Sequence, residues 1–345
     1  MIKNMQELIT ELEAAGELHR IKAPVDPSLE ITEITDRVSK SNSLALLFEN
    51  VGESAFPVLI NAFGSNDRMR KILGCQSFDD IGARIQAFLD TKPPGSLKEK
   101  LRTLFTLKEM SGFLPRKVKS APCQEVMHGP ESELLDLLPI LTCWPQDAGP
   151  FITLPLVVTK DPDTGTQNLG MYRMQKFDRA TTGMHWQYNK DGARHFDKYR
   201  ERNQRMEVAV ALGGSPAVTY ASSAPMPPEV DELMLAGFLN NSPVEIVKAK
   251  TVDLFVPAQS DFVIEGYVDP EESRIEGPFG DHTGFYSPAD YYPVFHVTCI
   301  TRRNEAVYPA TVVGKPPMED VYMAKATERI FLPLIRMLVP EIVDM

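Results

Sequence analysis

The chain has 345 residues, of which 43% are hydrophobic and 24% charged, so it is long enough for two or three domains with a buried core. Its net charge of -11, with 36 Lys and Arg against 47 Asp and Glu, argues against nucleic acid as a main partner, because phosphate backbones bind basic surfaces. The sequence shows no uninterrupted apolar run of membrane length, no signal peptide and no zinc pattern among its four cysteines, which favours a cytoplasmic protein.

The first hundred residues have the pattern of a small α+β unit. Leu8 and Leu12 recur at helical spacing, so the chain is predicted to open with an amphipathic helix that ends near Gly16. The elements expected next are a strand at 18–21, a helix at 30–40, and strands at 44–48 and 57–60.

From about residue 120 the pattern changes to short apolar segments separated by Gly, Pro and Asp. Such spacing is typical of the strands of a barrel. The predicted strands are 153–159, 206–212, 217–220, 244–248, 262–268 and 294–301. One helix, at 229–240, is expected to interrupt them after Pro227 and Pro228, since proline is tolerated in the first helical turn.

We therefore predict an α+β fold in three parts. An N-terminal α/β domain, 1–115, is expected to end at the Pro/Gly stretch 92–95 or at the basic stretch that follows Pro115, and a β-barrel domain occupies 116–305. The last part, 306–345, begins a C-terminal α/β domain with a strand and a helix. The sequence stops soon after that helix, so we expect the third domain to be truncated.

The first polar segment that could carry chemistry runs from Asn168 to Arg173. Asn168 is either a turn residue or a ligand, since asparagine readily bonds local backbone groups in turns. Arg173 shares a strand face with Met171, and in a cavity its guanidinium would suit a carboxylate or a phosphate. A surface salt bridge is the alternative for Arg173.

In the second segment, 184–191, aromatic, amide and basic residues alternate. A flavin ring needs flat apolar contacts and hydrogen-bond donors, and this composition supplies both. An ordinary exposed strand and turn would have a similar composition.

The third segment, 221–232, combines small residues with Glu232 in the first turn of the predicted helix. Acidic residues at a helix start often serve only to complement the helix dipole. Alternatively, Glu232 is a metal ligand, and Asn168 supplies a second oxygen to the same divalent cation.

The fourth segment, 276–286, is the most specific, because Glu276 and Asp281 are joined by a Gly/Pro turn. The two carboxylates can converge on one space, and a shared apolar site is expected to raise at least one of their pKa values. Such a pair suits a proton donor. The alternative is a glycine-rich loop with solvated acids.

Three motifs, taken together and in order, resemble the UbiD-type decarboxylases: Asn-Leu-Gly-Met-Tyr-Arg at 168–173, Glu-Gly-Pro-Phe-Gly-Asp-His-Thr-Gly at 276–284, and Gly-Lys-Pro-Pro at 314–317. The resemblance covers nearly the whole chain. It implies that 116–305 is a split β-barrel related to flavin reductases, which binds the cofactor, and that a C-terminal α/β domain helps full-length proteins to form homo-oligomers.

The resemblance also implies a reaction. This reaction is the non-oxidative decarboxylation of an aromatic or α,β-unsaturated acid, possible in either direction, with prenylated FMN made by a separate flavin prenyltransferase. Mn2+ and often K+ would accompany the flavin phosphate. The substrate hypothesis from the motifs is 3-polyprenyl-4-hydroxybenzoate of ubiquinone biosynthesis. With a polyprenylated substrate, the protein would contact the membrane surface peripherally.

Roles for individual residues follow from the same resemblance. Arg173, Glu276 and Asp281 would form the catalytic group, with Asp281 protonating the carbon after CO2 leaves. Asn168 and Glu232 would bind the metal. The residues expected to contact the flavin are Met171, Tyr172, Arg173, His185, Trp186, Gln187, Lys190, Asp191 and Ser222.

Two other interpretations stay open beside the decarboxylase, which Arg173, Glu276 and Asp281 together favour. Asn189 stands where many family members carry a histidine metal ligand, so Asn189 or His185 is expected to replace it. Together with the expected truncation, this departure favours an incompetent paralogue or fragment that only binds flavin or a partner subunit. A flavin reductase would fit the barrel, but it has no use for the paired acids.

Overall fold

A computed structural model describes residues 2–41, 43–89, 111–226 and 230–345. Its helices are α1 (Met5–Ala14), α2 (Glu30–Ser39), α3 (Asn66–Leu73), α4 (Phe78–Leu89), α6 (Asp191–Glu201), α7 (Pro216–Ala221), α8 (Glu232–Asn240) and α9 (Glu319–Leu338), with short 3-10 turns η1 (Pro122–Gln124) and η2 (Leu134–Leu137). Its strands are β1 (Leu18–Val25), β2 (Ala45–Val51), β3 (Val58–Ile60), β4 (Arg116–Val118), β5 (Val126–His128), β6 (Phe151–Ile152), β7 (Leu156–Lys160), β8 (Gln167–Met171), β9 (Met174–Gln175), β10 (Thr181–Gly183), β11 (Met206–Leu212), β12 (Glu245–Lys248), β13 (Phe255–Pro257), β14 (Phe262–Glu276), β15 (Phe279–Gly280), β16 (Tyr286–Ser287), β17 (Asp290–Arg302) and β18 (Tyr308–Ala310). None of the described helices is both long enough and apolar enough to cross a bilayer.

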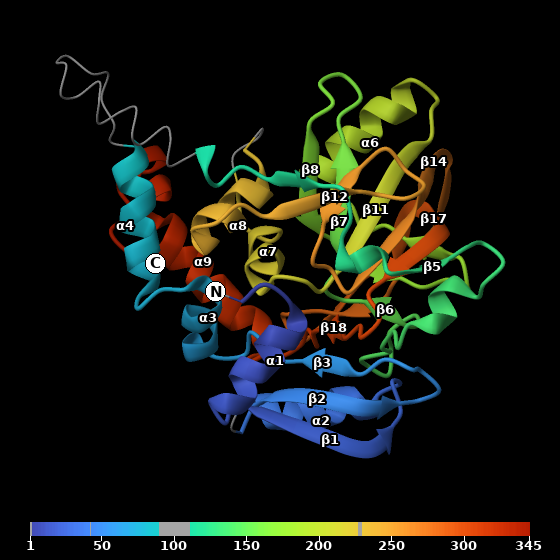
Figure 1. Ribbon diagram of the computed structural model, residues 1–345, viewed down its shortest axis with the longest axis horizontal. Helices are drawn as coiled ribbons and strands as arrows, with labels where there is room; N and C mark the ends of the chain where they lie inside the picture. The colour runs from blue at the N-terminus through green and yellow to red at the C-terminus, as the bar shows by residue number, and fades with distance from the viewer. Residues whose placement is uncertain (1, 42, 90–110, 227–229) are drawn as a thin grey trace.

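The N-terminal part folds around a four-stranded sheet of order β1-β2-β3-β18 (Figure 1). Helix α1 begins after Asn4, whose side chain accepts a hydrogen bond from the Glu7 backbone at 2.9 Å, and it buries Leu8 and Leu12 completely, as its spacing predicted. Strand β18 pairs with β3 in parallel, so a segment from the far end of the chain completes this sheet. The predicted boundary at 92–95 lies outside the described residues.

The middle of the chain forms a seven-stranded sheet of order β10-β17-β14-β11-β7-β8, with β5 added to β17. The two long strands β14 and β17 pair along most of their length, and irregularities in register occur near Gly266 and after Val268. A side chain at Gly266 would meet the His296 carbonyl at 1.8 Å, so this close approach requires glycine. The described strands form open sheets rather than a closed barrel; the mixed α+β class is confirmed, but the split barrel is not.

Two predictions about secondary structure in this region were wrong. Residues 217–220 belong to helix α7 rather than to a strand, and all six residues of that helix are buried. A short run buried on every side shows neither helical nor strand periodicity, so its type cannot be assigned from the pattern. The second wrong prediction was that a single helix interrupts the strands, because α6 was not expected. The expected helix at 229–240 is present as α8 from Glu232, while its expected start at Pro227, Pro228 and Glu229 lies outside the described residues.

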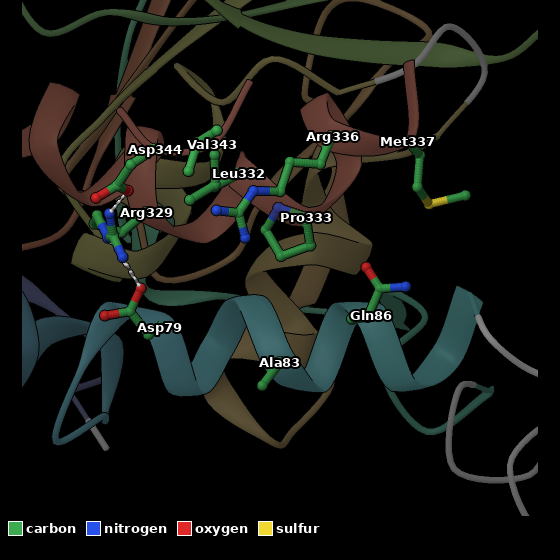
Figure 2. A pocket seen from close by; sticks show the side chains of 10 residues that line it. All are labelled: Asp79, Ala83, Gln86, Arg329, Leu332, Pro333, Arg336, Met337, Val343 and Asp344. Carbon is green, nitrogen blue, oxygen red and sulfur yellow. Dashed lines mark hydrogen bonds and ion pairs between the residues drawn. The ribbon is translucent and has the colours of Figure 1, made fainter. Parts of the chain in front are cut away.

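Helix α9 lies alongside α4 (Figure 2). Gly82 allows the close approach, because a side chain there would lie 3.1 Å from the Arg329 carbonyl oxygen, and Asp79 forms a 2.7 Å ion pair with the Arg329 guanidinium. A pocket of about 580 Å³ between the two helices is lined by Ala83, Pro333 and neighbouring side chains, and by none of the predicted site residues.

The buried carboxylate of Asp261 joins three parts of the fold. It accepts hydrogen bonds from the backbone N–H groups of Gly214 at 3.0 Å and Val307 at 3.1 Å, and from the Gln6 amide at 3.0 Å. Burial raises the pKa of Asp261 to about 6, although these hydrogen bonds oppose the shift. Asp261 therefore ties α1 and the segment before β18 to the large sheet.

The substitution Asp261→Ala is expected to lower the free energy of unfolding by about 2–4 kcal/mol, because two buried backbone N–H groups lose their acceptor. Urea denaturation followed by circular dichroism measures the change. The control is Asp253→Ala, which removes an exposed carboxylate that pairs with Lys160 and Lys248. A loss for Asp261→Ala no larger than that for the control would contradict the assigned role.

Candidate active site

Strand β8 forms one side of the candidate site. It is the edge strand of the large sheet, and no other strand of the described residues pairs with its outer N–H groups. The Leu169 N–H donates to the Glu232 carboxylate at 3.0 Å, and the Met171 N–H donates to the Ser222 carbonyl at 3.0 Å. The edge of β8 thus brings the first and third predicted segments together. Arg173 follows two residues after the end of the strand.

Arg173 and Glu276 form a two-pronged ion pair at the centre of the site. The Arg173 Nε donates to Oε1 of Glu276 at 2.9 Å, and one terminal nitrogen donates to Oε2 at 3.2 Å. Glu276 is fully buried and the Arg173 side chain is 12% exposed. The alternatives of a surface salt bridge for Arg173 and of a solvated acid for Glu276 are therefore both wrong.

His185 supplies the other partner of the Glu276 carboxylate. Its Nδ1 lies 2.8 Å from Oε2 of Glu276, and its ring packs on Tyr292 with a centroid distance of 4.3 Å. An ionised carboxylate only accepts hydrogen bonds, so Nδ1 is the donor. His185 thus holds Glu276, and its Nδ1 is not available to a metal ion.

Asp281 approaches the same guanidinium from the loop between β15 and β16. Its Oδ2 lies 3.6 Å from a terminal nitrogen of Arg173, and its Oδ1 accepts hydrogen bonds from the backbone and the ring of His282, both at 2.8 Å. The Asp281 side chain is 29% exposed. The two acids of the fourth segment converge on Arg173, as their spacing predicted.

The expected rise in at least one of the two pKa values is wrong. Burial acts to raise the pKa of Glu276, but hydrogen bonds from His185 and Arg173 outweigh it, and the pKa lies below its ordinary value. Burial also acts to raise the pKa of Asp281, and the hydrogen bonds from His282 together with the charge of Arg173 reverse its effect. With these hydrogen bonds and the charge of Arg173, both acids are carboxylates at neutral pH.

A turn at 144–148, which the sequence did not indicate, fixes the loop that carries Asp281. Oδ1 of Asp147 accepts from the Gly280 N–H at 2.7 Å, and its Oδ2 accepts from the Trp144 N–H at 2.9 Å. The Trp144 indole donates to the Val313 carbonyl at 2.7 Å, and a side chain at Gly280 would meet the indole ring at 2.1 Å. These contacts run mainly through backbone groups, which leave no signature in the residue types.

Asn168 and Glu232 lie together at the other end of β8. With its amide nitrogen turned toward Glu232, Asn168 donates to Oε1 at 3.0 Å. Asp231 caps helix α8 by accepting from the Leu233 N–H, so the role of complementing the helix start belongs to Asp231, while the Glu232 carboxylate faces β8. Burial raises the pKa of Glu232 to about 7.

A pocket of about 600 Å³ opens beside these two residues, and it is also lined by Asp191 and His195. Asp191 and His195 are four residues apart on α6 and so share a helix face, a spacing that would have indicated His195 had the helix been expected. Within the described ranges, no group of three or more His, Cys, Asp or Glu side chains could hold a metal ion. In the same orientation the Asn168 amide oxygen accepts from the Leu169 N–H at 3.2 Å, and carboxylate and amide oxygens are the ligand types that hard cations take.

The residues expected to contact a flavin differ in exposure. Tyr172 and Trp186 are buried, and Trp186 packs on Phe196 of α6 with a centroid distance of 5.4 Å. The Trp186 indole N–H is a buried donor without a partner among the described residues. Of the remaining expected residues, Ser222 is buried, and the partly buried ones are Met171, Arg173, His185 and Asp191. Gln187 and Lys190 are exposed, and so is Asn189.

Comparison with known proteins gives a consistent result. Residues 116–316 match the 3-octaprenyl-4-hydroxybenzoate carboxy-lyase Rift-related domain, and residues 9–85 match the N-terminal domain of that carboxy-lyase. An uncharacterized protein of Archaeoglobus fulgidus is 50% identical over 343 residues, covering 99% of this chain and 70% of that protein. A second one, of Aquifex aeolicus, is 48% identical over 345 residues, covering 99% of this chain and 71% of that protein.

Solved structures agree with these sequence matches. An evolved dimeric form of the UbiD-class enzyme HmfF from Pelotomaculum thermopropionicum, in complex with prFMN, is 30% identical with a TM-score of 0.84, covering 99% of this chain and 75% of that chain. The vanillic acid decarboxylase of Sedimentibacter hydroxybenzoicus in closed form is 27% identical with a TM-score of 0.85, covering 100% of this chain and 71% of that chain. With family models over most of its length and relatives near half identity, the chain belongs to the UbiD family of carboxy-lyases.

Proposed function

We propose that this protein removes CO2 from an aromatic or α,β-unsaturated acid, using prenylated FMN and a divalent metal. The observation that carries the proposal is the position of Arg173 between the Glu276 and Asp281 carboxylates. A protein that only bound flavin would need none of these three groups, so the geometry favours an enzyme over an incompetent fragment. A flavin reductase would likewise have no use for the two acids.

Arg173 is suited to bind the carboxylate of the substrate. Two of its nitrogens are engaged by Glu276, which fixes the plane of the guanidinium. The terminal nitrogen toward Asp281 lies 3.6 Å from the nearest carboxylate oxygen, which is beyond ordinary hydrogen-bond distance, so it keeps donors for an incoming anion.

Asp281 is the proposed donor of the proton that replaces CO2. Loss of CO2 from a carboxylate leaves a carbon that must gain one proton, and Asp281 is the more exposed of the two acids. A substrate carboxylate at Arg173 adds negative charge and shares the guanidinium whose charge, after the hydrogen bonds from His282, helps to lower the pKa of Asp281. Substrate binding is therefore expected to raise this pKa and allow Asp281 to carry a proton.

Prenylated FMN, when bound, supplies the electron sink that decarboxylation at an sp2 carbon requires. We propose that Asn168 and Glu232 hold Mn2+ at the phosphate end, with Ser222, Lys190 and Asp191 nearby and K+ as a second ion. The ring end would lie along 171–173 and 185–187. Because the rings of Tyr172 and Trp186 are buried against the protein, we propose that these two residues bind the flavin through backbone groups and through the Trp186 indole N–H, which has no partner among the described residues. Asn168 and Arg173 are five residues apart, about 17 Å at most along extended chain, which suits an elongated ligand.

Several further properties are proposed on family grounds. The three parts 1–115, 116–305 and 306–345 would correspond to family domains, with the middle one as the cofactor-binding split barrel. The protein would act in the cytoplasm as a homo-oligomer, supported by the dimeric form of the HmfF relative. The substrate class proposed first is the 4-hydroxybenzoates, including the 3-polyprenyl form of ubiquinone biosynthesis.

Cofactor dependence is tested by producing the protein with and without a flavin prenyltransferase. Four acids serve as probes: 4-hydroxybenzoate, vanillate, 3,4-dihydroxybenzoate and cinnamate. We expect CO2 release from at least one acid, and only after co-production with the prenyltransferase. Protein that binds the prenylated flavin and Mn2+ yet releases no CO2 from any of the four would refute the proposal.

The role of Asp281 is tested by Asp281→Asn, which keeps the shape of the side chain but removes the acid. Turnover should fall by about a hundredfold or more, the usual range for a lost general acid, while flavin and metal contents stay unchanged. Asp290→Asn makes the same chemical change at an exposed position of the same hairpin and should retain activity. Full activity of Asp281→Asn would contradict the assignment.

The role of Arg173 is tested by Arg173→Lys, which keeps the charge but loses the two-pronged contact with Glu276. We expect kcat/KM to fall by about tenfold to a hundredfold, as for the loss of a charged hydrogen bond. The matched control is Arg179→Lys, since Arg179 is 69% exposed and lies 3.9 Å from Glu133. Equal kinetics for the two variants would show that a positive charge alone is sufficient at position 173.

A further inference from the structure

The two oxygens of Asp281 face different surroundings. Oδ2 faces the Arg173 guanidinium, while Oδ1 accepts hydrogen bonds from the His282 backbone N–H and from Nδ1 of its ring. The His282 side chain is 67% exposed. Asp281 therefore connects the interior of the site with a titratable group that contacts bulk water.

Each turnover of the proposed reaction consumes one proton from solvent, because a carboxylate is converted into CO2 and a C–H bond. Glu276 cannot collect this proton, since it is fully buried and its oxygens are already bonded to Arg173 and His185. Asp281 is a carboxylate in the resting site and must be reprotonated every cycle. The side chain in hydrogen-bond contact with Asp281 is the imidazole of His282, and histidine is the residue type that proteins commonly use to carry protons.

We propose that His282 passes a proton from solvent to Asp281 in each turnover. This inference rests on the proposed function, and it assigns to His282 a role exerted through Asp281 rather than on the substrate. In the step, the Nδ1–H bond of the imidazolium breaks and an O–H bond forms at Oδ1, which leaves a neutral imidazole and a neutral carboxylic acid. The carboxyl group turns about its Cβ–Cγ bond to present the proton to the substrate carbon, and His282 regains a proton from water.

Charged side chains of both signs lie around the contact between Asp281 and His282. Asp281 lies on its own loop, and Asp320 at the start of α9 interacts electrostatically with both His282 and Asp281. The opposing cations are Arg173, which faces the far oxygen of Asp281, and Lys315, whose Cβ would lie 3.1 Å from a side chain at Gly284. Two carboxylates thus lie near the imidazole, and the Arg173 guanidinium beyond Asp281 is held by Glu276.

The test compares wild-type protein with His282→Asn, since the asparagine amide can still donate to Asp281 but cannot carry a proton at neutral pH. Both are loaded with prenylated FMN and mixed with whichever acid of the panel above the wild type decarboxylates fastest. Rapid quenching then separates the first equivalent of CO2 per site from later equivalents. CO2 leaves before the carbon is protonated, so we expect an unchanged first equivalent and later release slowed at least tenfold.

Two further variants sharpen the test. Imidazole added to His282→Ala should restore the later equivalents, because the site of the missing ring is open to solvent. His19→Asn removes an exposed histidine of β1 and should leave both phases unchanged. Equal slowing of the first and later equivalents would show that His282 only holds the loop, and unchanged kinetics would show that it has no role; either outcome overturns the proposal.

A measurement without cofactor tests the contact itself. In the 15N-labelled, cofactor-free protein, the low-field Nδ1 proton signal of His282 should disappear in Asp281→Ala, while circular dichroism stays unchanged. Persistence of that signal would overturn the proposal. If the wild-type protein binds the flavin but releases no CO2, the proposed function is refuted. If the wild type is active and His282→Asn is equally active, only the role of His282 is refuted.

Discussion

The Glu276 carboxylate has no exposed surface, and the arrangement of the site depends on how its charge is compensated. Arg173 and His185 do this together, from segments 103 and 91 residues away in the chain. A side chain at Gly183 of β10 would lie 3.1 Å from the Cγ of Glu276, a tight contact that glycine avoids. Loss of one partner of a buried ion pair typically costs about 3–5 kcal/mol, so these residues form one unit.

The other groups of the site are arranged around the fixed Arg173 guanidinium. Glu276 orients Arg173 from inside, Asp281 approaches it from the partly exposed side, and the turn at Trp144 and Asp147 holds the loop of Asp281 by its backbone. Strand β8 then runs from this end to Asn168 and the pocket beside α6. The outer N–H groups of this edge strand are available to other segments: the Leu169 N–H binds the Glu232 side chain of α8, and the Met171 N–H binds the backbone carbonyl of Ser222, which follows α7.

The sequence predicted the parts of the site whose residues lie within one motif, and it failed where distant segments decide the outcome. The convergence of Glu276 and Asp281 followed from their spacing and from the family resemblance. The direction of their pKa shifts did not, because it depends on His185 and Arg173, which only folding brings to Glu276. Asp147 was missed because it bonds to backbone N–H groups, which every sequence contains.

The same limit applies to the fold. The amphipathic α1 and the short apolar run of β11 were predictable from local pattern, whereas α7 is buried on all sides and shows no periodicity. The pairing of β18 with β3 of the N-terminal sheet and the register of β14 with β17 depend on long-range contacts, which a local pattern does not contain.

Arg173, held by Glu276, is proposed to bind the substrate carboxylate. A crystal structure of the flavin-loaded protein with an unreactive aromatic carboxylate tests this role. We expect a carboxylate within hydrogen-bond distance of the Arg173 guanidinium; a carboxylate bound elsewhere, with Arg173 still paired only to its two acids, would contradict this role of Arg173.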